Sequence, residues 1–313
     1  MSELQNAYYG EVAPEREGFI PERGDSRIWY RANGLDKDGV PLLIVHGGPG
    51  FSHHYLLSLT DLAADRPVYF YDQSDTGMSD RPGRRDRWNV EHFVDEIETV
   101  RQGLGLERFF VLGHSWGGTL VPPYAARHPA GLAGVILASP AVSEPRWAAD
   151  AIRLRQTLPA EMRERLESHE RAGTRDSQEY QETCEAYSAR FFCNTDPWPE
   201  DILKTFDYMN GEQFAAMWGF TDFGAEPGTS CKGYDGTSHL SAISVPTLFT
   251  GGEFDECQPE TLRDYGDLVP DSQIEIFAGA SHSPQYEVRK AWMDTVSTWM
   301  RDVEARSDLV DEQ

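Results

Sequence analysis

The sequence of 313 residues predicts an α/β fold, in which a mostly parallel, doubly wound sheet carries a helical insertion. Short, continuously apolar and β-branched runs alternate with amphipathic stretches of helical period, and this alternation is typical of βαβ units. The alternation stops between about residues 143 and 240 and then resumes. Because the strand pattern flanks the insertion on both sides, we expect one sheet with a cap.

Each expected element depends on its own local pattern. The run SRIWYRAN (26–33) predicts an early strand, antiparallel and at an edge of the sheet. PLLIVHGG (41–48) is continuously apolar, as expected of a parallel strand that is buried on both faces. Residues 90–106 repeat their apolar side chains at the period of a helix. The strands expected in chain order are 26–33, 41–48, 67–73, 108–115, 131–140, 245–255 and 273–281, and the helices around them are 54–64, 90–106, 259–268 and about 287–306.

The segment 143–240 contains no convincing strand pattern. It is acidic, rich in Glu, Arg and aromatic residues, and helical in period, for example over 151–172. We therefore expect residues 1–142 and 241–313 to form the core domain and residues 143–240 to form a helical cap, or lid.

Composition excludes several classes of partner. The chain carries 28 basic and 52 acidic residues, a formal charge of −24, which repels nucleic acid and anionic membrane surfaces. Cys184, Cys193, Cys231 and Cys257 show no zinc-ligand spacing and are expected to be free thiols, so we expect neither metal nor cofactor. Residues 1–19 contain no apolar signal region. We expect a cytoplasmic protein.

The clearest chemical motif is G-x-S-x-G at residues 113–117, between an expected strand and an expected helix. A serine on such a turn is held in a strained backbone conformation, with the N–H groups of the helix N-terminus nearby. These features predict that Ser115 is a nucleophile.

A nucleophilic serine needs a base and a carboxylate that orients the base. Asp255 follows the expected strand 245–255, and His282 follows the strand 273–281. The carboxyl ends of parallel strands meet at one edge of a sheet, where ligands bind. We therefore expect Ser115, Asp255 and His282 to form a catalytic triad.

The third motif is His46-Gly47-Gly48-Pro49-Gly50, after the strand that begins near residue 41. A glycine-rich turn exposes backbone N–H groups at the strand end. We expect the main-chain N–H groups of Gly48 and Trp116 to form an oxyanion hole.

Together these motifs resemble the proline iminopeptidase family of α/β-hydrolases, and most of all its tricorn-interacting-factor aminopeptidases. The resemblance extends from about residue 15 to residue 305. The motifs that carry it are HGGPG (46–50), YDQ with the following G-x-S (71–79), Arg81-Pro82, GHSWGG (113–118), GEFDE (252–256) and GASHSP (279–284).

The resemblance implies an α/β-hydrolase fold and a serine exopeptidase that removes one N-terminal residue, proline or a small apolar residue, through an acyl-enzyme. It also implies that Glu256 binds the free amine of a peptide or aminoacyl amide. The second amine-binding glutamate of the family corresponds here to Asp222. Another departure is Asp75, which replaces a family glycine and places a new carboxylate near the expected site.

Alternatives of other classes stay open. Relatives of the same chemistry include amino-acid amidases and hydrolases that remove an aminoacyl protecting group from a macrolactam intermediate. An esterase or lactonase would use the same triad but would give the pair Glu256 and Asp222 no purpose. A non-catalytic binding protein with this fold is disfavoured because all three triad positions are filled.

Overall fold

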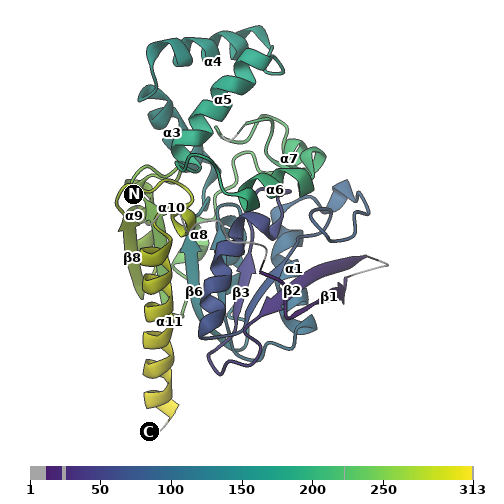
Figure 1. The fold of residues 1–313 in the computed structure, drawn as a ribbon, viewed down its shortest axis with the longest axis vertical. Helices are drawn as coiled ribbons and strands as arrows, with labels where there is room; N and C mark the ends of the chain where they lie inside the picture. The colour runs from purple at the N-terminus through teal and green to yellow at the C-terminus, as the bar shows by residue number, and fades with distance from the viewer. Residues whose placement is uncertain (1–11, 23–25, 222, 312–313) are drawn as a thin grey trace.

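The computed structural model describes residues 12–22, 26–221 and 223–311, and its centre is an eight-stranded sheet (Figure 1). The strand order is β1-β2-β4-β3-β5-β6-β7-β8. All pairs from β4 to β8 are parallel, while β1 and β2 are antiparallel to their neighbours. The strands are β1 Arg16–Pro21, β2 Arg27–Asn33, β3 Leu42–Val45, β4 Val68–Tyr71, β5 Phe109–His114, β6 Leu132–Ala138, β7 Thr247–Gly252 and β8 Ser272–Phe277.

The predicted doubly wound, mostly parallel sheet is confirmed, but one strand is placed differently. The expected edge strand corresponds to β2, which lies inside the sheet between β1 and β4. The edge position belongs to β1, which the sequence analysis did not identify. The side chains of β1 show no regular alternation between buried and exposed positions, and only Ile20 is buried. The strand therefore lacks the apolar run that marks the central strands.

Helices cover both faces of the sheet. One apolar core lies under α1, α2, α8 and α9, and the other lies under η2, α10 and α11. The expected helix 54–64 is present as the 3₁₀ helix η2. These elements are η2 His53–Ala64, η3 Arg85–Arg87, α1 Val90–Gly103, α2 Gly117–Ala125, α9 Pro259–Gly266, α10 Pro284–Glu287 and α11 Arg289–Asp311.

Between β6 and β7 the described chain forms helices and no strand of the sheet. In Figure 1, α4 and α5 project from the top of the molecule, while α6 and α7 lie nearer the sheet. A separate small apolar cluster, which includes Leu166, Tyr180 and Tyr187, holds the projecting helices together. The helices are α3 Glu144–Gln156, α4 Ala160–Ala172, α5 Gln178–Phe191, α6 Glu200–Tyr208, α7 Gly211–Met217 and α8 Thr237–Leu240.

None of the described helices combines the length and the apolar character needed to cross a membrane.

Candidate active site

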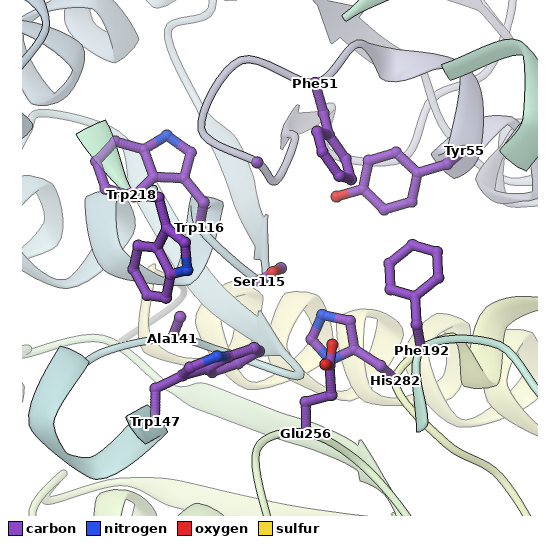
Figure 2. Close-up of a pocket in the computed structure, with 11 residues that line it drawn as sticks. Phe51, Tyr55, Ser115, Trp116, Ala141, Trp147, Phe192, Trp218, Glu256 and His282 are labelled. Atoms are coloured by element: carbon purple, nitrogen blue, oxygen red, sulfur yellow. The ribbon is translucent and has the colours of Figure 1, made fainter. Parts of the chain in front are cut away.

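A pocket opens at the carboxyl ends of the central strands (Figure 2). This is the edge at which open α/β sheets bind ligands. Aromatic side chains form most of its wall, and three groups able to take part in catalysis, a hydroxyl, an imidazole and a carboxylate, face it. It is lined by Gly48, Phe51, Tyr55, Ser115, Trp116, Ala141, Trp147, Phe192, Trp218, Glu256 and His282.

Ser115 lies on the turn between β5 and α2, with a left-handed φ of 55°. Main-chain bonds fix the turn, because the Ser115 N–H donates to Ala138 (3.1 Å) and the Ser115 carbonyl accepts from Ala141 (3.0 Å). A side chain at Gly117 would place its Cβ 2.2 Å from the carbonyl oxygen of Val45. The glycine after the serine is therefore required for α2 to pack against β3.

His282 and Asp255 form a buried pair beside Ser115. The His282 Nδ1–H donates to Asp255 Oδ1 at 2.7 Å, and the two residues are 1% and 0% exposed. Asp255 also accepts from the Ser139 hydroxyl (2.6 Å) and from the main-chain N–H groups of Gly252 and Cys257 (both 3.0 Å). Donors therefore hold both carboxylate oxygens, and the carboxylate in turn fixes the imidazole orientation.

The glycine-rich turn 46–50 approaches Ser115 closely. A side chain at Gly47 would place its Cβ 3.0 Å from the Ser115 Cβ and 2.5 Å from the Tyr55 hydroxyl. Gly48, with φ of 123°, lines the pocket, as does Trp116 on the other side of Ser115. The structure thus brings together both residues expected to supply the oxyanion hole.

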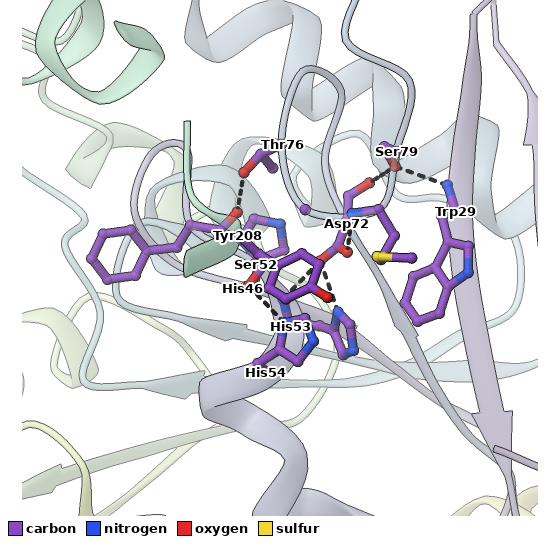
Figure 3. Close-up of polar contacts among 12 residues, drawn as sticks. Trp29, His46, Ser52, His53, His54, Asp72, Thr76, Ser79 and Tyr208 are labelled. Carbon is purple, nitrogen blue, oxygen red and sulfur yellow. Dashed lines mark hydrogen bonds and ion pairs between the residues drawn. The ribbon is translucent and has the colours of Figure 1, made fainter. Parts of the chain in front are cut away.

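A buried polar network holds the loop 72–79 against this turn (Figure 3). Asp72 Oδ1 accepts from the main-chain N–H (2.7 Å) and the Nδ1–H (2.9 Å) of His53, and Oδ2 accepts from the Met78 N–H (2.8 Å). Burial alone raises the pKa of Asp72, but the rings of His53 and His46 outweigh burial and lower that pKa well below its usual range. The same burial lowers the pKa of His46 to about 4.

Asp75 stabilises this loop through buried hydrogen bonds. Its φ is 68°, and its carboxylate accepts from the Gly83 N–H (2.6 Å) and from the Trp88 indole N–H (2.7 Å). Asp75 is 2% exposed and is not among the residues that line the pocket. The carboxylate that departs from the family pattern therefore anchors Trp88.

The structure describes one of the two residues that are expected to bind the substrate amine. Glu256 is 3% exposed and lies beside His282 at the pocket wall (Figure 2). Asp222 lies outside the described residues.

Sequence reasoning missed most of the aromatic wall. Phe51 and Tyr55 follow the glycine-rich turn closely enough for proximity to have suggested them. Trp147 and Phe192 come from the insertion, and no local motif marks them.

Comparison with known proteins places this geometry in a family. A model described as "alpha/beta hydrolase fold" matches residues 40–287. The proline iminopeptidase of Heyndrickxia coagulans is 35% identical over 288 residues, which cover 92% of this chain and 99% of that protein. The proline iminopeptidase of Thermoplasma volcanium is 32% identical, with 87% of this chain and 92% of that protein covered.

Solved structures agree with the sequence relatives. The crystal structure of VinJ matches with a TM-score of 0.89 at 34% identity, covering 93% of this chain and 100% of VinJ. The proline iminopeptidase of Mycobacterium smegmatis matches with a TM-score of 0.87 at 30% identity, with the same coverage of both chains. On this identity, coverage and fold, the chain belongs to the proline iminopeptidase family of α/β-hydrolases.

Proposed function

We propose that this protein is a serine aminopeptidase-type hydrolase that removes one N-terminal residue, proline or a small apolar residue. Its substrate would be a peptide or an aminoacyl amide with a free amine. The observation that carries the proposal is that Ser115 faces the same buried pocket as His282, whose ring is held by Asp255. Family membership supports the peptidase activity.

The proposed reaction is acyl transfer in two steps. The Ser115 hydroxyl attacks the substrate carbonyl while His282 Nε2 takes the hydroxyl proton, and the same nitrogen then protonates the leaving amine. Water next attacks the acyl-enzyme, again through His282, and frees the amino acid and Ser115. Asp255 keeps the proton on Nδ1, so that Nε2 can act as the base. The N–H groups of Gly48 and Trp116 would stabilise the oxyanion.

We also propose that residues 143–240 act as a lid over a core made of residues 1–142 and 241–313. Trp147, Phe192 and Trp218, all from this segment, contribute to the pocket wall. An aromatic wall that ends the pocket would leave no room for residues before the first one. Such a lid accounts for removal of a single residue rather than cleavage of internal bonds.

Recognition of the amine is proposed for Glu256, with Asp222 as its partner from the lid. A substrate ammonium that enters a buried pocket loses its hydration and needs a negative charge in compensation. The carboxylate of Glu256 is buried at the pocket wall, near Ser115 and His282.

The setting of the protein is also proposed to be cytoplasmic. Among the described residues, Cys184, Cys193, Cys231 and Cys257 are free, as is usual in a reducing compartment. The charge of −24 favours peptides and small amides over nucleic acid or membrane surfaces as partners.

The proposal is tested by labelling and by a substrate panel. A fluorophosphonate probe should label the native enzyme and Ser52→Ala, whose hydroxyl is buried against His54, but should not label Ser115→Ala. Aminoacyl-naphthylamides with Pro, Ala and Leu should be cleaved, and N-acetylated versions should not. Hydrolysis of p-nitrophenyl esters without cleavage of any free-amine amide would favour the esterase alternative. Labelling of Ser115→Ala at the native rate would contradict the serine mechanism.

A further inference from the structure

Away from the pocket, three side chains of metal-binding type meet where β1 ends against α1. Glu22 directly follows β1, while His92 and Glu96 lie one turn apart on the same face of α1. His92 Nε2 is 3.5 Å from Glu22 Oε1 and 4.0 Å from Glu96 Oε2. One ligand atom from each residue lies within 4.8 Å of the other two. No spacing motif marks the cluster in the sequence, because Glu22 and His92 lie 70 positions apart.

Several atoms of this cluster are buried without a hydrogen-bond partner in the described part of the chain. They are Glu22 Oε2, His92 Nε2 and Glu96 Oε1. The side chains of Glu22 and Glu96 are only 4% and 0% exposed, and with Asp95 and Thr99 they line a small cavity. Buried polar atoms are normally bonded, so three unpaired atoms around one cavity indicate a missing ligand.

The charges around the cavity favour a cation. The carboxylates of Glu22, Glu96 and Asp95 line it, and Arg87 reaches one oxygen of Glu22 at 3.2 Å. Glu96 Oε2 accepts from the N–H (3.0 Å) and the hydroxyl of Ser74, which are neutral donors. Arg127 pairs with Asp95 at 2.6 Å, so that of the three carboxylates only Glu96 has no guanidinium or ammonium partner among the described residues.

We propose that Glu22, His92 and Glu96 bind a divalent transition-metal ion of the Zn²⁺ type. Metal–nitrogen and metal–oxygen bonds of about 2.0–2.2 Å place neighbouring donors of a tetrahedral site about 3.4 Å apart. The separations from His92 Nε2, 3.5 Å to Glu22 Oε1 and 4.0 Å to Glu96 Oε2, are about 0.1 and 0.6 Å longer than this value. One imidazole and two carboxylates are a usual donor set for zinc, with water in the fourth position.

Such an ion would act on the fold rather than in the reaction. It would fasten the end of β1 to the first turns of α1. Through Glu96 it would also fix the position of Ser74, which donates its N–H to that carboxylate. The neighbouring residue, Gln73, accepts a hydrogen bond from the Trp116 indole N–H at 3.0 Å. The site therefore adjoins the loop that supports the pocket, without lining the pocket.

The test is a Co²⁺ titration of EDTA-treated, desalted protein, followed by visible absorption and by competition with Zn²⁺. Native protein should bind one equivalent of Co²⁺ and lose the absorption band to Zn²⁺. Glu22→Gln and His92→Gln should each weaken Co²⁺ binding at least about 100-fold, since even outer partners of a metal contribute ~10–100-fold. Circular dichroism would establish that both variants fold, and Zn²⁺ should raise the Tm of the native protein but not that of His92→Gln.

Two controls separate this site from others. Asp95→Asn removes a carboxylate from the same cavity, but Asp95 is bonded to Arg127 at 2.6 Å and is 45% exposed. It should change the affinity by less than about fivefold, the usual effect of an exposed charge. His282→Ala should leave Co²⁺ binding intact, which excludes the pocket as its source. The proposal is overturned if the native protein gives no band, or if the band survives unchanged in both Glu22→Gln and His92→Gln.

Discussion

His114 is bonded to the main chain of His282, with its Nε2 3.0 Å from the His282 carbonyl oxygen. A carbonyl can only accept, so Nε2 carries the proton and Nδ1 accepts from the Tyr55 hydroxyl at 3.0 Å. The Tyr55 oxygen in turn accepts from the Gly47 N–H at 2.7 Å. Burial, together with the nearby ring of His282, lowers the pKa of His114 well below its usual range, as this neutral tautomer requires. The chain of bonds connects the glycine-rich turn to His282.

Removal of the Tyr55 hydroxyl should therefore destabilise the protein. Tyr55→Phe leaves the buried Gly47 N–H without its acceptor and His114 Nδ1 without its donor. We expect the free energy of unfolding to fall by about 1–3 kcal/mol, the usual effect of a buried polar group left unpaired. Urea denaturation measures this change.

Tyr71→Phe is the matched control. The Tyr71 hydroxyl is also buried, but within the described residues it has no hydrogen-bond partner. Its removal should leave the free energy of unfolding unchanged or slightly higher. An equal decrease in the free energy of unfolding in the two variants would show that the hydrogen bonds of Tyr55 do not contribute to stability.

Stability should also depend on pH through His46. Burial lowers its pKa to about 4 in the folded protein, while an unfolded histidine titrates near 6.5. Below pH ~6.5 the unfolded chain binds the extra proton, so this contribution is complete at higher pH and is lost as the pH falls toward 4. As the pH falls from about 7.5 to 5, the lowered pKa of His46 alone should reduce the free energy of unfolding by about 2 kcal/mol.

The measurement compares slopes rather than absolute stabilities. The free energy of unfolding of His46→Gln should fall less steeply with falling pH than that of the native protein. His128→Asn replaces an exposed histidine that already has a left-handed φ of 54°. This control should keep the native slope. A native slope in His46→Gln would rule out His46 as a source of the acid sensitivity.

The third prediction separates the two roles of Asp75, which are its left-handed backbone and its buried acceptors. Asp75→Gly should lower the free energy of unfolding by about 1–3 kcal/mol, since the Trp88 indole N–H loses its partner. Asp75→Ala should lower it by roughly 1 kcal/mol more, because a Cβ disfavours the left-handed conformation. Asp75→Asn should lower it least of the three. Thermal unfolding of the three variants gives the order, and an alanine variant at least as stable as glycine would refute the strain argument.

The parts predicted well from sequence were those with a strong local signal. The central strands β3 and β5 are buried throughout and mostly apolar, and the glycines around Ser115 and Gly48 mark tight turns by themselves. The edge strand β1 escaped prediction because its exposure is irregular. Most of the aromatic pocket wall and the cluster of Glu22 and His92 escaped prediction because they arise from tertiary packing between distant segments, which leaves no periodic trace.

The last prediction concerns the substrate amine and depends on the proposed function. If Glu256 faces the ammonium, removal of its charge leaves that ammonium buried without compensation, which typically costs ~2–5 kcal/mol. Glu256→Gln should then lower kcat/KM at least about thirtyfold on free-amine substrates, since ~2 kcal/mol corresponds to that factor. Activity of the native enzyme should fall at alkaline pH, where the substrate amine deprotonates.

Glu253→Gln provides the control for this prediction. Glu253 lies three residues earlier, is exposed, and accepts from the Gly279 N–H at 2.9 Å outside the pocket. Its kcat/KM should stay within about twofold of native, because an exposed charge contributes little. Fluorophosphonate labelling at the native rate in Glu256→Gln would show that the nucleophile is intact and that only amine binding was lost. If Glu256→Gln and Glu253→Gln hydrolyse free-amine substrates equally well, Glu256 does not bind the amine and the esterase alternative gains weight.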